Sequence, residues 1–195
     1  MGNGVQMLYD SPDVDVVGFD VYASPLTQFV GDAHQIPLSD AAVDAVVCQA
    51  VLEHVLDPVQ VVREIRRVLR PDGVVYAEVP FLQPVHAGRF DFTRYTASGL
   101  RYLFREFEEI HADVVAGPGT QALWSVEFLA TGLLRSRTAG RVVRVLLSWL
   151  RLLDRLVPPD YAQDAACALA FLGRVSCSPA IDQRQIIDYY RGAQR

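Results

Sequence analysis

The pattern of hydrophobic and polar positions is clearest between residues 43 and 79. Ala45 to Cys48 is a short, nearly continuous apolar run, which is typical of a strand buried on both faces in a parallel sheet. Residues 59–69 then place apolar side chains at helical spacing, with charged side chains opposite. Val74 to Val79 is a second apolar run. The region therefore predicts one strand–helix–strand unit, with parallel strands and a right-handed connection.

The helix in this unit carries start and stop signals. Asp57 can cap its first turn, Pro58 suits the first helical position, and Gln60 falls where a capping-box partner belongs. Pro71-Asp72-Gly73 is expected to end the helix before the next strand. Polar residues from Gln49 to His54 follow the first strand, at the end where ligands bind in open α/β sheets.

Weaker patterns predict the remaining elements. Thr96 can cap a helix whose apolar side is Leu100, Leu103, Phe104 and Phe107, and Gly117-Pro118-Gly119 reads as a turn. The other expected elements are a weak helix ending at Tyr9, strands at 14–21, 27–30, 110–115 and 166–175, helices at about 121–134 and 140–157, and a short tail helix with Ile186, Ile187 and Tyr190 on one side.

Composition narrows the class of protein. The 195 residues are 51% hydrophobic and 21% charged, as expected for one globular domain. A net charge of -5, with every basic residue an arginine, argues against general nucleic-acid binding. Cys48, Cys167 and Cys177 have no zinc or disulfide spacing. We see neither a signal peptide nor an apolar run of membrane-spanning length, so a cytoplasmic location is expected.

Small and acidic residues at successive strand ends outline a nucleoside site. Gly2 and Gly4 precede the first helix, where glycines let a ligand approach the backbone. Asp20 ends the next strand, at about the spacing at which an acid reaches a ribose diol. Asp32 follows the third strand and could accept a hydrogen bond from an adenine amino group. The predicted site lies beside Cys48-Gln49-Ala50.

Four consecutive stretches, GFDVY, GDAHQIPL, DAVVCQAVLEHVLDP and EIRRVLRPDGVVYAEVP, resemble the motifs of class I S-adenosylmethionine-dependent methyltransferases of the type 11 small-molecule group. HAGRFDFTRYTASGL resembles a later segment of one branch of that group. The resemblance implies a three-layer, Rossmann-like α/β fold with a seven-stranded sheet, and S-adenosylmethionine bound across its centre. It implies that Asp20 and Val21 contact the ribose, that Asp32 and Ala33 bracket the adenine, that Gln49 lies near the methionine moiety, and that Gly2 and Gly4 belong to the cofactor loop.

The start of the chain departs from the family pattern. The family opens with an apolar strand that is central in its sheet, between the strands ending here at Asp20 and Gln49, and this chain begins after it. Two explanations are open: a start assigned too late, which we favour, or a degenerate protein that no longer binds cofactor. A nicotinamide dehydrogenase fits less well, because Met7 stands where its third small residue belongs.

Methyl transfer needs an aligned acceptor, and an oxygen or nitrogen acceptor also needs a base. The candidate bases are His54, His86 and Asp91, each of which could instead be structural: His54 beside the helix start, the other two in a loop that packs on itself through Phe90, Phe92 and Tyr95. Glu53, Arg94 and Tyr95 are placed on the substrate side, and Arg94 could pair with an acidic substrate or with Asp91. No metal is indicated, because no residues have metal-ligand spacing.

The predicted helix 140–157 is basic and amphipathic, so it could lie on an anionic membrane or pack on its own domain or a second subunit. We expect one domain over 1–195, with a core at 1–119, a helical insertion at 120–160, a last strand at 161–178 and a tail at 179–195. The predicted function is methylation of a small-molecule or lipid-linked acceptor. The alternative is a catalytically inactive methyltransferase-like partner or membrane-surface protein.

Overall fold

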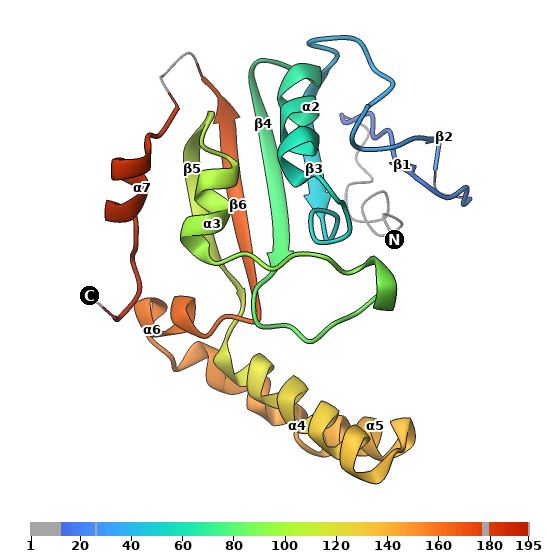
Figure 1. Cartoon of the computed structure of the whole chain (residues 1–195), viewed down its shortest axis with the longest axis vertical. Coiled ribbons are helices and arrows are strands. Elements are labelled where there is room, and N and C mark those ends of the chain that lie inside the picture. Colours follow the sequence, from blue (N-terminus) through green and yellow to red (C-terminus); the bar gives the residue numbers. More distant parts are fainter. Residues whose placement is uncertain (1–12, 26, 177–179, 195) are drawn as a thin grey trace.

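The computed structural model describes residues 13–25, 27–176 and 180–194. Figure 1 shows strands with helices packed in front of them and a helical arm that extends below. In chain order the elements are β1 (Phe19–Asp20), β2 (Phe29–Val30), β3 (Val43–Gln49), α2 (Pro58–Val68), β4 (Leu69–Pro80), the 3-10 turn η1 (Gly88–Phe90), α3 (Ala97–Leu103), β5 (Phe107–Ala116), α4 (Pro118–Leu134), α5 (Arg137–Leu146), the 3-10 segment η2 (Ser148–Arg155), α6 (Pro159–Asp164), β6 (Ala168–Val175) and α7 (Gln183–Asp188).

The described strands form two sheets. A four-stranded sheet has the order β3-β4-β6-β5, and β1 pairs with β2 in a separate parallel sheet. β3 and β4 are parallel, which confirms the predicted strand–helix–strand unit. β6 is antiparallel to both β4 and β5, so β3, β4 and β5 all end at the same edge. The α/β class is confirmed.

The β1 strand is much shorter than the expected strand at 14–21. Only Phe19 and Asp20 pair, with Phe29 and Val30 of β2. Within the described ranges β3 bonds to β4 on one side, and Asp44 and Ala45 are exposed. The expectation that β3 is buried on both faces is therefore wrong.

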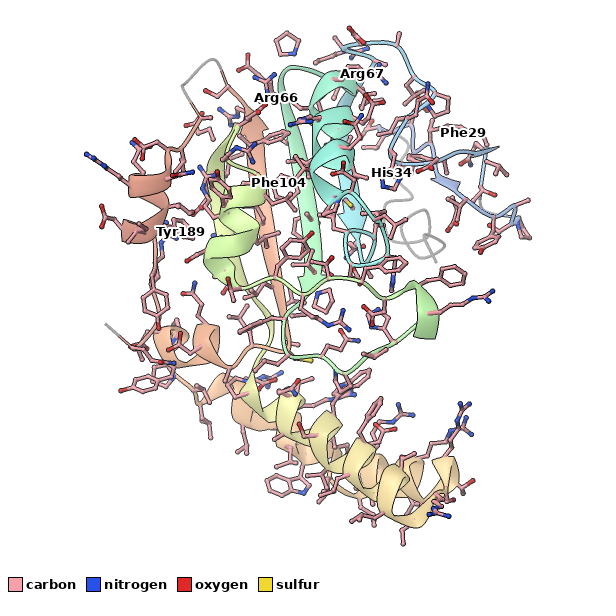
Figure 2. The ribbon with its side chains drawn as sticks, viewed as in Figure 1. Phe29, His34, Arg66, Arg67, Phe104 and Tyr189 are labelled. Atoms are coloured by element: carbon pink, nitrogen blue, oxygen red, sulfur yellow. The ribbon has the colours of Figure 1, made fainter. Side chains whose placement is uncertain are left out.

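The core lies between the four-stranded sheet and two helices. Val75, Ala77 and Val79 of β4 are at most 1% exposed, and α2 and α3 cover them (Figure 1). Phe104, labelled in Figure 2, stacks on Phe171 of β6 at 4.8 Å between ring centroids. The sequence assigned Phe107 to the same helix face as Phe104. It is instead the first residue of β5, because α3 ends at Leu103.

Hydrogen bonds join the start and the end of α2 to the loop that follows β2; His34 and Arg67, which take part in them, are labelled in Figure 2. Asp57 caps the helix by accepting from Gln60 N at 3.0 Å, and Pro58 is its first residue, as expected. Gln60 is no capping-box partner, because its amide donates to His34 O at 3.3 Å. Asp57 N donates to His34 Nε2 at 3.2 Å. At the other end Arg67 donates to the carbonyls of Ile36 and Leu38, each at 2.8 Å.

β4 begins earlier than the sequence indicated. The helix ends at Val68 and the strand starts at Leu69, so Pro71-Asp72-Gly73 lies inside the strand. The pairing with β3 shifts register there, and Asp72 has a left-handed φ of 64°. These residues form a bulge, which lets the chain reverse directly from helix to strand.

The expected insertion forms a helical arm of α4, α5 and η2. Gly117 is the cap of α4 and Pro118 its first residue, so Gly117-Pro118-Gly119 is a helix start rather than a free turn. The predicted helix 140–157 is also wrong, because α5 ends at Leu146 and the chain continues as η2. A Cβ on Gly119 would lie 2.2 Å from Leu150 O. This contact requires η2 to pass very close to α4, and the chain departs from α-helix there.

Large apolar side chains are exposed in the helical arm, whereas those of the sheet region are largely buried. The apolar side chains of the arm include Val145, Leu146 and Leu156, exposed by 71%, 68% and 77%. These three side chains are therefore free of close packing, although the segment itself lies against α4. No helix in the described ranges combines the length and apolar character required to cross a bilayer. In the tail, α7 leaves Ile187 75% exposed, so the expected apolar side is wrong at that residue.

Candidate active site

The candidate site lies at the carboxyl ends of β3 and β4. β3 ends at Gln49, and Ala50 then adopts a left-handed φ of 51° while its N–H donates to Glu78 O of β4 at 3.1 Å. This conformation is uncommon for a residue other than glycine and is found at functional sites. It turns the chain sharply away from the sheet, so residues 51–56 lie over the strand ends.

The loop of residues 81–96, which follows β4, closes over this turn. Phe92 N donates to Glu53 O at 2.8 Å, and Thr93 N donates to the same carbonyl at 3.3 Å. His54 Nδ1 is 2.7 Å from Phe90 O. These contacts join two segments that are far apart in the sequence. They bring four titratable side chains, Glu53, His54, His86 and Asp91, into one cluster.

Glu53 is the centre of this cluster. Its side chain is 0% exposed, and Oε1 lies 3.4 Å from His86 Nε2 and 3.7 Å from His54 Nε2. The two imidazole rings meet edge to face at 4.8 Å between centroids. Burial raises the pKa of Glu53 although His54, His86 and Arg94 all act to lower it. Desolvation is the largest effect, as expected for a carboxyl group away from water.

Asp91 and Arg94 support the cluster from one side. Arg94 donates to both carboxylate oxygens of Asp91, with Nη2 to Oδ2 at 2.6 Å. Asp91 Oδ2 also accepts from His86 N at 2.8 Å and lies 3.5 Å from His86 Nδ1. The Arg94 guanidinium lowers the pKa of Asp91 to about 2. Asp91 therefore stays ionised and positions His86, but it is a weak base.

These contacts answer several questions left open by the sequence. The candidate bases His54, His86 and Asp91 lie together, with Glu53 between the two histidines. Arg94 pairs with Asp91. Tyr95 is buried at 8% exposure, whereas Phe90 and Phe92 are 46% and 47% exposed. A loop that packs on itself through Phe90 and Phe92 is therefore wrong, and the loop packs on the Glu53 turn instead.

The expected cofactor residues keep their places at strand ends. Asp20 is the last residue of β1, Asp32 follows β2 by two positions, and Gln49 is the last residue of β3. Val21 is 56% exposed and Ala33 is partly buried. Gly2 and Gly4 lie outside the described residues. The cofactor roles of all these residues stay predictions.

The donor set at these strand ends suits a nucleoside. Carboxylates and a carboxamide accept hydrogen bonds from ribose hydroxyls and an adenine amino group. Asp32 accepts from His34 N at 2.9 Å and contacts His34 Nδ1 at 2.6 Å, and these contacts lower its pKa. Asp32 is therefore ionised, with its side chain still 64% exposed. Asp20, Asp32 and Gln49 fit S-adenosylmethionine by their chemistry, and each lies at or just after the end of a strand.

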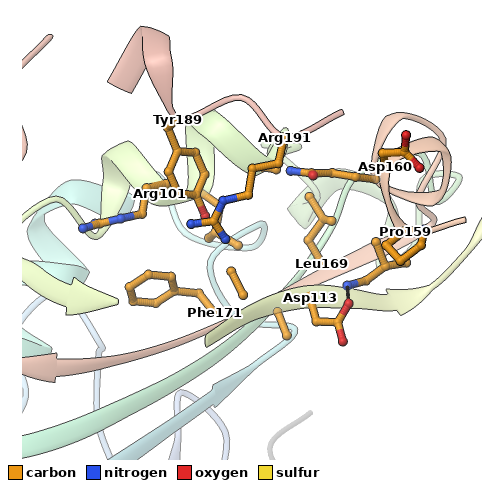
Figure 3. A pocket seen from close by; sticks show the side chains of 14 residues that line it. Arg101, Asp113, Pro159, Asp160, Leu169, Phe171, Tyr189 and Arg191 are labelled. Atoms are coloured by element: carbon orange, nitrogen blue, oxygen red, sulfur yellow. Dashed lines mark hydrogen bonds between the residues drawn. The ribbon is translucent and has the colours of Figure 1, made fainter. Parts of the chain in front are cut away.

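Two cavities lie away from the cluster. One of about 530 Å³ opens between residues 30–37 and α2, where Glu64 and Arg67 already pair with each other. Another of about 170 Å³ lies beside β5 and β6, with Arg101, Tyr189 and Arg191 on its wall (Figure 3). Arg101 and Arg191 both contact Glu109, at 3.2 and 3.0 Å. The charges of the smaller cavity are matched within the protein, and the larger cavity is also lined by Asp32, which is expected to contact the adenine, so neither is favoured as the place of methyl transfer.

The central position of Glu53 in the cluster was not predicted from the sequence. The sequence placed Glu53 on the substrate side, whereas the fold buries this residue completely between two histidines. The available signal was an acid next to a histidine directly after a buried strand. Cys48 lies in the same region, and burial raises its pKa to about 12, so it is an unreactive thiol. Cys48 and Cys167 are free, as expected, and Cys177 lies outside the described residues.

Comparisons with known proteins agree with this arrangement. Residues 3–77 match the methyltransferase domain family. The chain is 48% identical over 50 residues to a probable S-adenosylmethionine-dependent methyltransferase of Mycolicibacterium smegmatis, and 50% identical over 44 residues to an uncharacterized protein of transposon Tn4556 from Streptomyces fradiae. These matches cover 26% and 23% of this chain, and 20% and 13% of the two relatives.

Solved structures extend the likeness beyond the matched segment. The crystal structure of an S-adenosylmethionine-dependent methyltransferase from Archaeoglobus fulgidus superposes with a TM-score of 0.56. The superposition covers 89% of this chain and 82% of that one, at 13% identity, so it shows the fold alone. In sequence, residues 3–77 are therefore similar to the methyltransferase domain family, and in fold the chain is similar to an S-adenosylmethionine-dependent methyltransferase.

Proposed function

We propose that this protein transfers a methyl group from S-adenosylmethionine to a small-molecule or lipid-linked acceptor. The observation that carries the proposal is the Glu53–His54–His86–Asp91 cluster at the carboxyl ends of β3 and β4. Two members of the cluster, Glu53 and His54, follow Gln49, which ends β3 and is expected to contact the cofactor. When bound, S-adenosylmethionine would supply an electrophilic methyl group on its sulfonium.

Each residue of the site then has a defined task. Asp20 and Asp32 would hold the ribose and adenine, and Gln49 would lie toward the methionine end. His86 is the candidate base, because Arg94 and Asp91 hold it while its Nε2 faces the cluster. The loop of residues 81–96 covers the cluster and limits the access of water. Glu53, buried between the imidazoles, stabilises positive charge on the ring that takes the proton.

Calorimetry with S-adenosylmethionine and its demethylated product tests the cofactor assignment. Replacing Asp20 by Ala should weaken binding about 10- to 100-fold, because a charge-assisted hydrogen bond contributes about 1.5–3 kcal/mol. Asp15→Ala is the matched control, since Asp15 is exposed and precedes β1. Unchanged affinity in Asp20→Ala would refute the ribose assignment. A folded chain that binds neither compound would instead support the catalytically inactive alternative.

The helical arm favours a second role at a membrane surface. β5 ends at the same edge of the sheet as β3 and β4, and α4 begins two residues later. The arm therefore starts from the edge that carries the site, as Figure 1 shows. Many large apolar side chains of the arm are exposed, namely Val126, Phe128, Leu129, Leu133, Leu134, Val142, Val145, Leu146, Trp149, Leu152 and Leu156. Exposed apolar surface of this extent marks an interaction site.

Charge favours an anionic lipid surface over a second copy of the chain. Residues 118–156 contain six arginines and two acids, a net charge of +4, although the whole chain has -5. Glu127 pairs with Arg144 at 3.6 Å, and Asp154 caps α4. Two such arms would repel each other, whereas arginines beside apolar side chains suit an anionic bilayer. We propose that the arm lies on the membrane and brings the site to a lipid-linked acceptor.

Vesicle co-sedimentation tests this second role. The protein should bind vesicles containing phosphatidylglycerol, and Leu146→Glu should abolish binding because it places a charge in the apolar surface. Ile187→Glu is the control, since Ile187 is equally exposed but lies on α7. Loss of binding in both variants, or none in the wild type, would contradict the membrane role. A dimer in light scattering that Leu146→Glu dissociates would assign the surface to self-association instead.

A further inference from the structure

We propose that Glu53, His54 and His86 form a binding site for a divalent transition-metal cation. One ligand atom from each residue, a carboxylate oxygen or an imidazole nitrogen, lies within 4.8 Å of the other two. The sequence indicated no metal, because His86 is more than 30 positions from Glu53 and no ligand spacing is visible. The cluster arises only when the loop of residues 81–96 folds over the turn after β3.

The distances are close to those of a metal site. Ligand atoms about 2.0–2.2 Å from a tetrahedral cation lie about 3.4 Å from one another. Glu53 Oε1 is 3.4 Å from His86 Nε2 and 3.7 Å from His54 Nε2. All three ligand atoms lie within 4.8 Å of one another, so binding would draw them together by at most about 1.4 Å.

The orientation of the imidazoles supports a cation. His54 Nδ1 lies 2.7 Å from Phe90 O, a carbonyl that can only accept, so this nitrogen carries the proton and Nε2 presents its lone pair. His86 Nδ1 faces Asp91 Oδ2 at 3.5 Å, which favours the same tautomer. Both Nε2 atoms then face the Glu53 carboxylate. Three acceptor atoms then converge, and either a proton on Glu53 or a bound cation would satisfy them.

The surrounding contacts resemble those that hold metal-binding histidines. Such a histidine usually donates its second N–H to a carboxylate or a backbone carbonyl, which fixes the ring. Phe90 O serves His54 in this way, whereas Asp91 Oδ2 lies near His86 Nδ1, at 3.5 Å, without a hydrogen bond between them. Asp91 is itself held by Arg94, so the position of His86 is fixed through two successive contacts. A histidine that binds no ligand does not need its ring to be held in this way.

Burial adds an independent argument. Glu53 is 0% exposed, and neither of its oxygens accepts a hydrogen bond from another described residue; His54 Nε2 is also buried without a hydrogen-bond partner. Leaving buried polar atoms unmatched costs free energy unless a ligand satisfies them. A coordinated cation would satisfy the carboxylate and the imidazole nitrogen together.

The ligand set selects the class of cation. Two imidazoles and one carboxylate suit Zn²⁺ or Fe²⁺, whereas Mg²⁺ prefers oxygen ligands throughout. Three protein ligands leave a position for an oxygen of the acceptor, whose pKa a cation would lower. The cation would then replace the His86 base in activating the acceptor. This last role rests on the proposed function, but cation binding itself does not.

Titration calorimetry with Zn²⁺ alone, on the whole chain without a histidine tag, tests the site. We expect one Zn²⁺ per chain, with binding at least 100-fold weaker in His86→Ala and in the nearly isosteric Glu53→Gln. His111→Ala is the matched control, because His111 is 67% exposed on β5 beside Asp113. It should bind zinc as the wild type does. Circular dichroism confirms that each variant is folded, and Mg²⁺ should not compete at millimolar concentration.

Several results would overturn the proposal. No stoichiometric binding by the folded wild type would mean that the cluster holds a proton rather than a metal. Binding retained in His86→Ala and Glu53→Gln but lost in His111→Ala would place the cation elsewhere. Asp20→Ala separates the two proposals, since it should lose cofactor binding and keep zinc binding. A chain that binds zinc but not S-adenosylmethionine would refute the proposed function and leave the cation site intact.

Discussion

Asp154 joins η2 to the start of α4 within the helical arm, and its removal has a calculable cost. The residue lies in η2 and accepts from three backbone N–H groups at the start of α4: Gly117 at 3.2 Å, Gly119 at 2.6 Å and Thr120 at 3.2 Å. The Thr120 hydroxyl also donates to it at 2.6 Å. Gly117, the cap residue, has no side chain to perform this task. Asp154 therefore caps α4 from a distance of 34 residues or more.

Asp154→Ala should destabilise the protein by about 1–3 kcal/mol. Loss of a capping side chain costs about 0.5–2 kcal/mol, and loss of a negative charge at a helix N-terminus adds about 0.3–1 kcal/mol. Both costs apply, because the Asp154 carboxylate supplies the capping hydrogen bonds and also the negative charge at the start of α4. Urea unfolding followed by circular dichroism measures the sum. Amide hydrogen exchange at Gly119 and Thr120 should accelerate, since these N–H groups lose their acceptor.

Asp154→Asn separates the two contributions. The amide oxygen can still accept from Gly119 N, so this variant should lose only the part due to charge. A wild-type unfolding midpoint for Asp154→Ala would refute the capping argument. So would unfolding of the whole arm with no change in exchange at Gly119, because the cost would then arise elsewhere.

Three further perturbations test the site and the core. Burial raises the pKa of Glu53, so its stabilising contribution is present below the ordinary value of about 4.3 and is lost as the pH rises through the raised value. Glu53→Gln should therefore flatten the decline in unfolding free energy above about pH 4 with chelator present; an unchanged decline would contradict the assignment. Arg94→Lys should raise the pKa of Asp91 from about 2, as measured by NMR titration, because the guanidinium contact lowers it. Phe104→Ala should cost about 3–5 kcal/mol in urea unfolding, since Phe104 is 0% exposed against Phe171.

Local patterns were sufficient for much of the fold. The strand at Val43–Gln49, the helix after Asp57 and the Thr96 cap were all predicted, because each depends on neighbouring residues. Boundaries failed where distant contacts act. The arm departs from α-helix because η2 must pass close to Gly119, and no local pattern contains that contact.

The candidate site shows the same division. The sequence alone determined that polar residues follow β3, that a histidine-bearing loop follows β4, and that these segments belong to a methyltransferase-type sheet. Only the tertiary structure decided that Glu53 is buried between His54 and His86, with Asp91 and Arg94 behind. The physical reason is that residue spacing encodes which strand end a side chain follows. The distance between two loops depends on the backbone hydrogen bonds that join them, here from Phe92 and Thr93 to the carbonyl of Glu53.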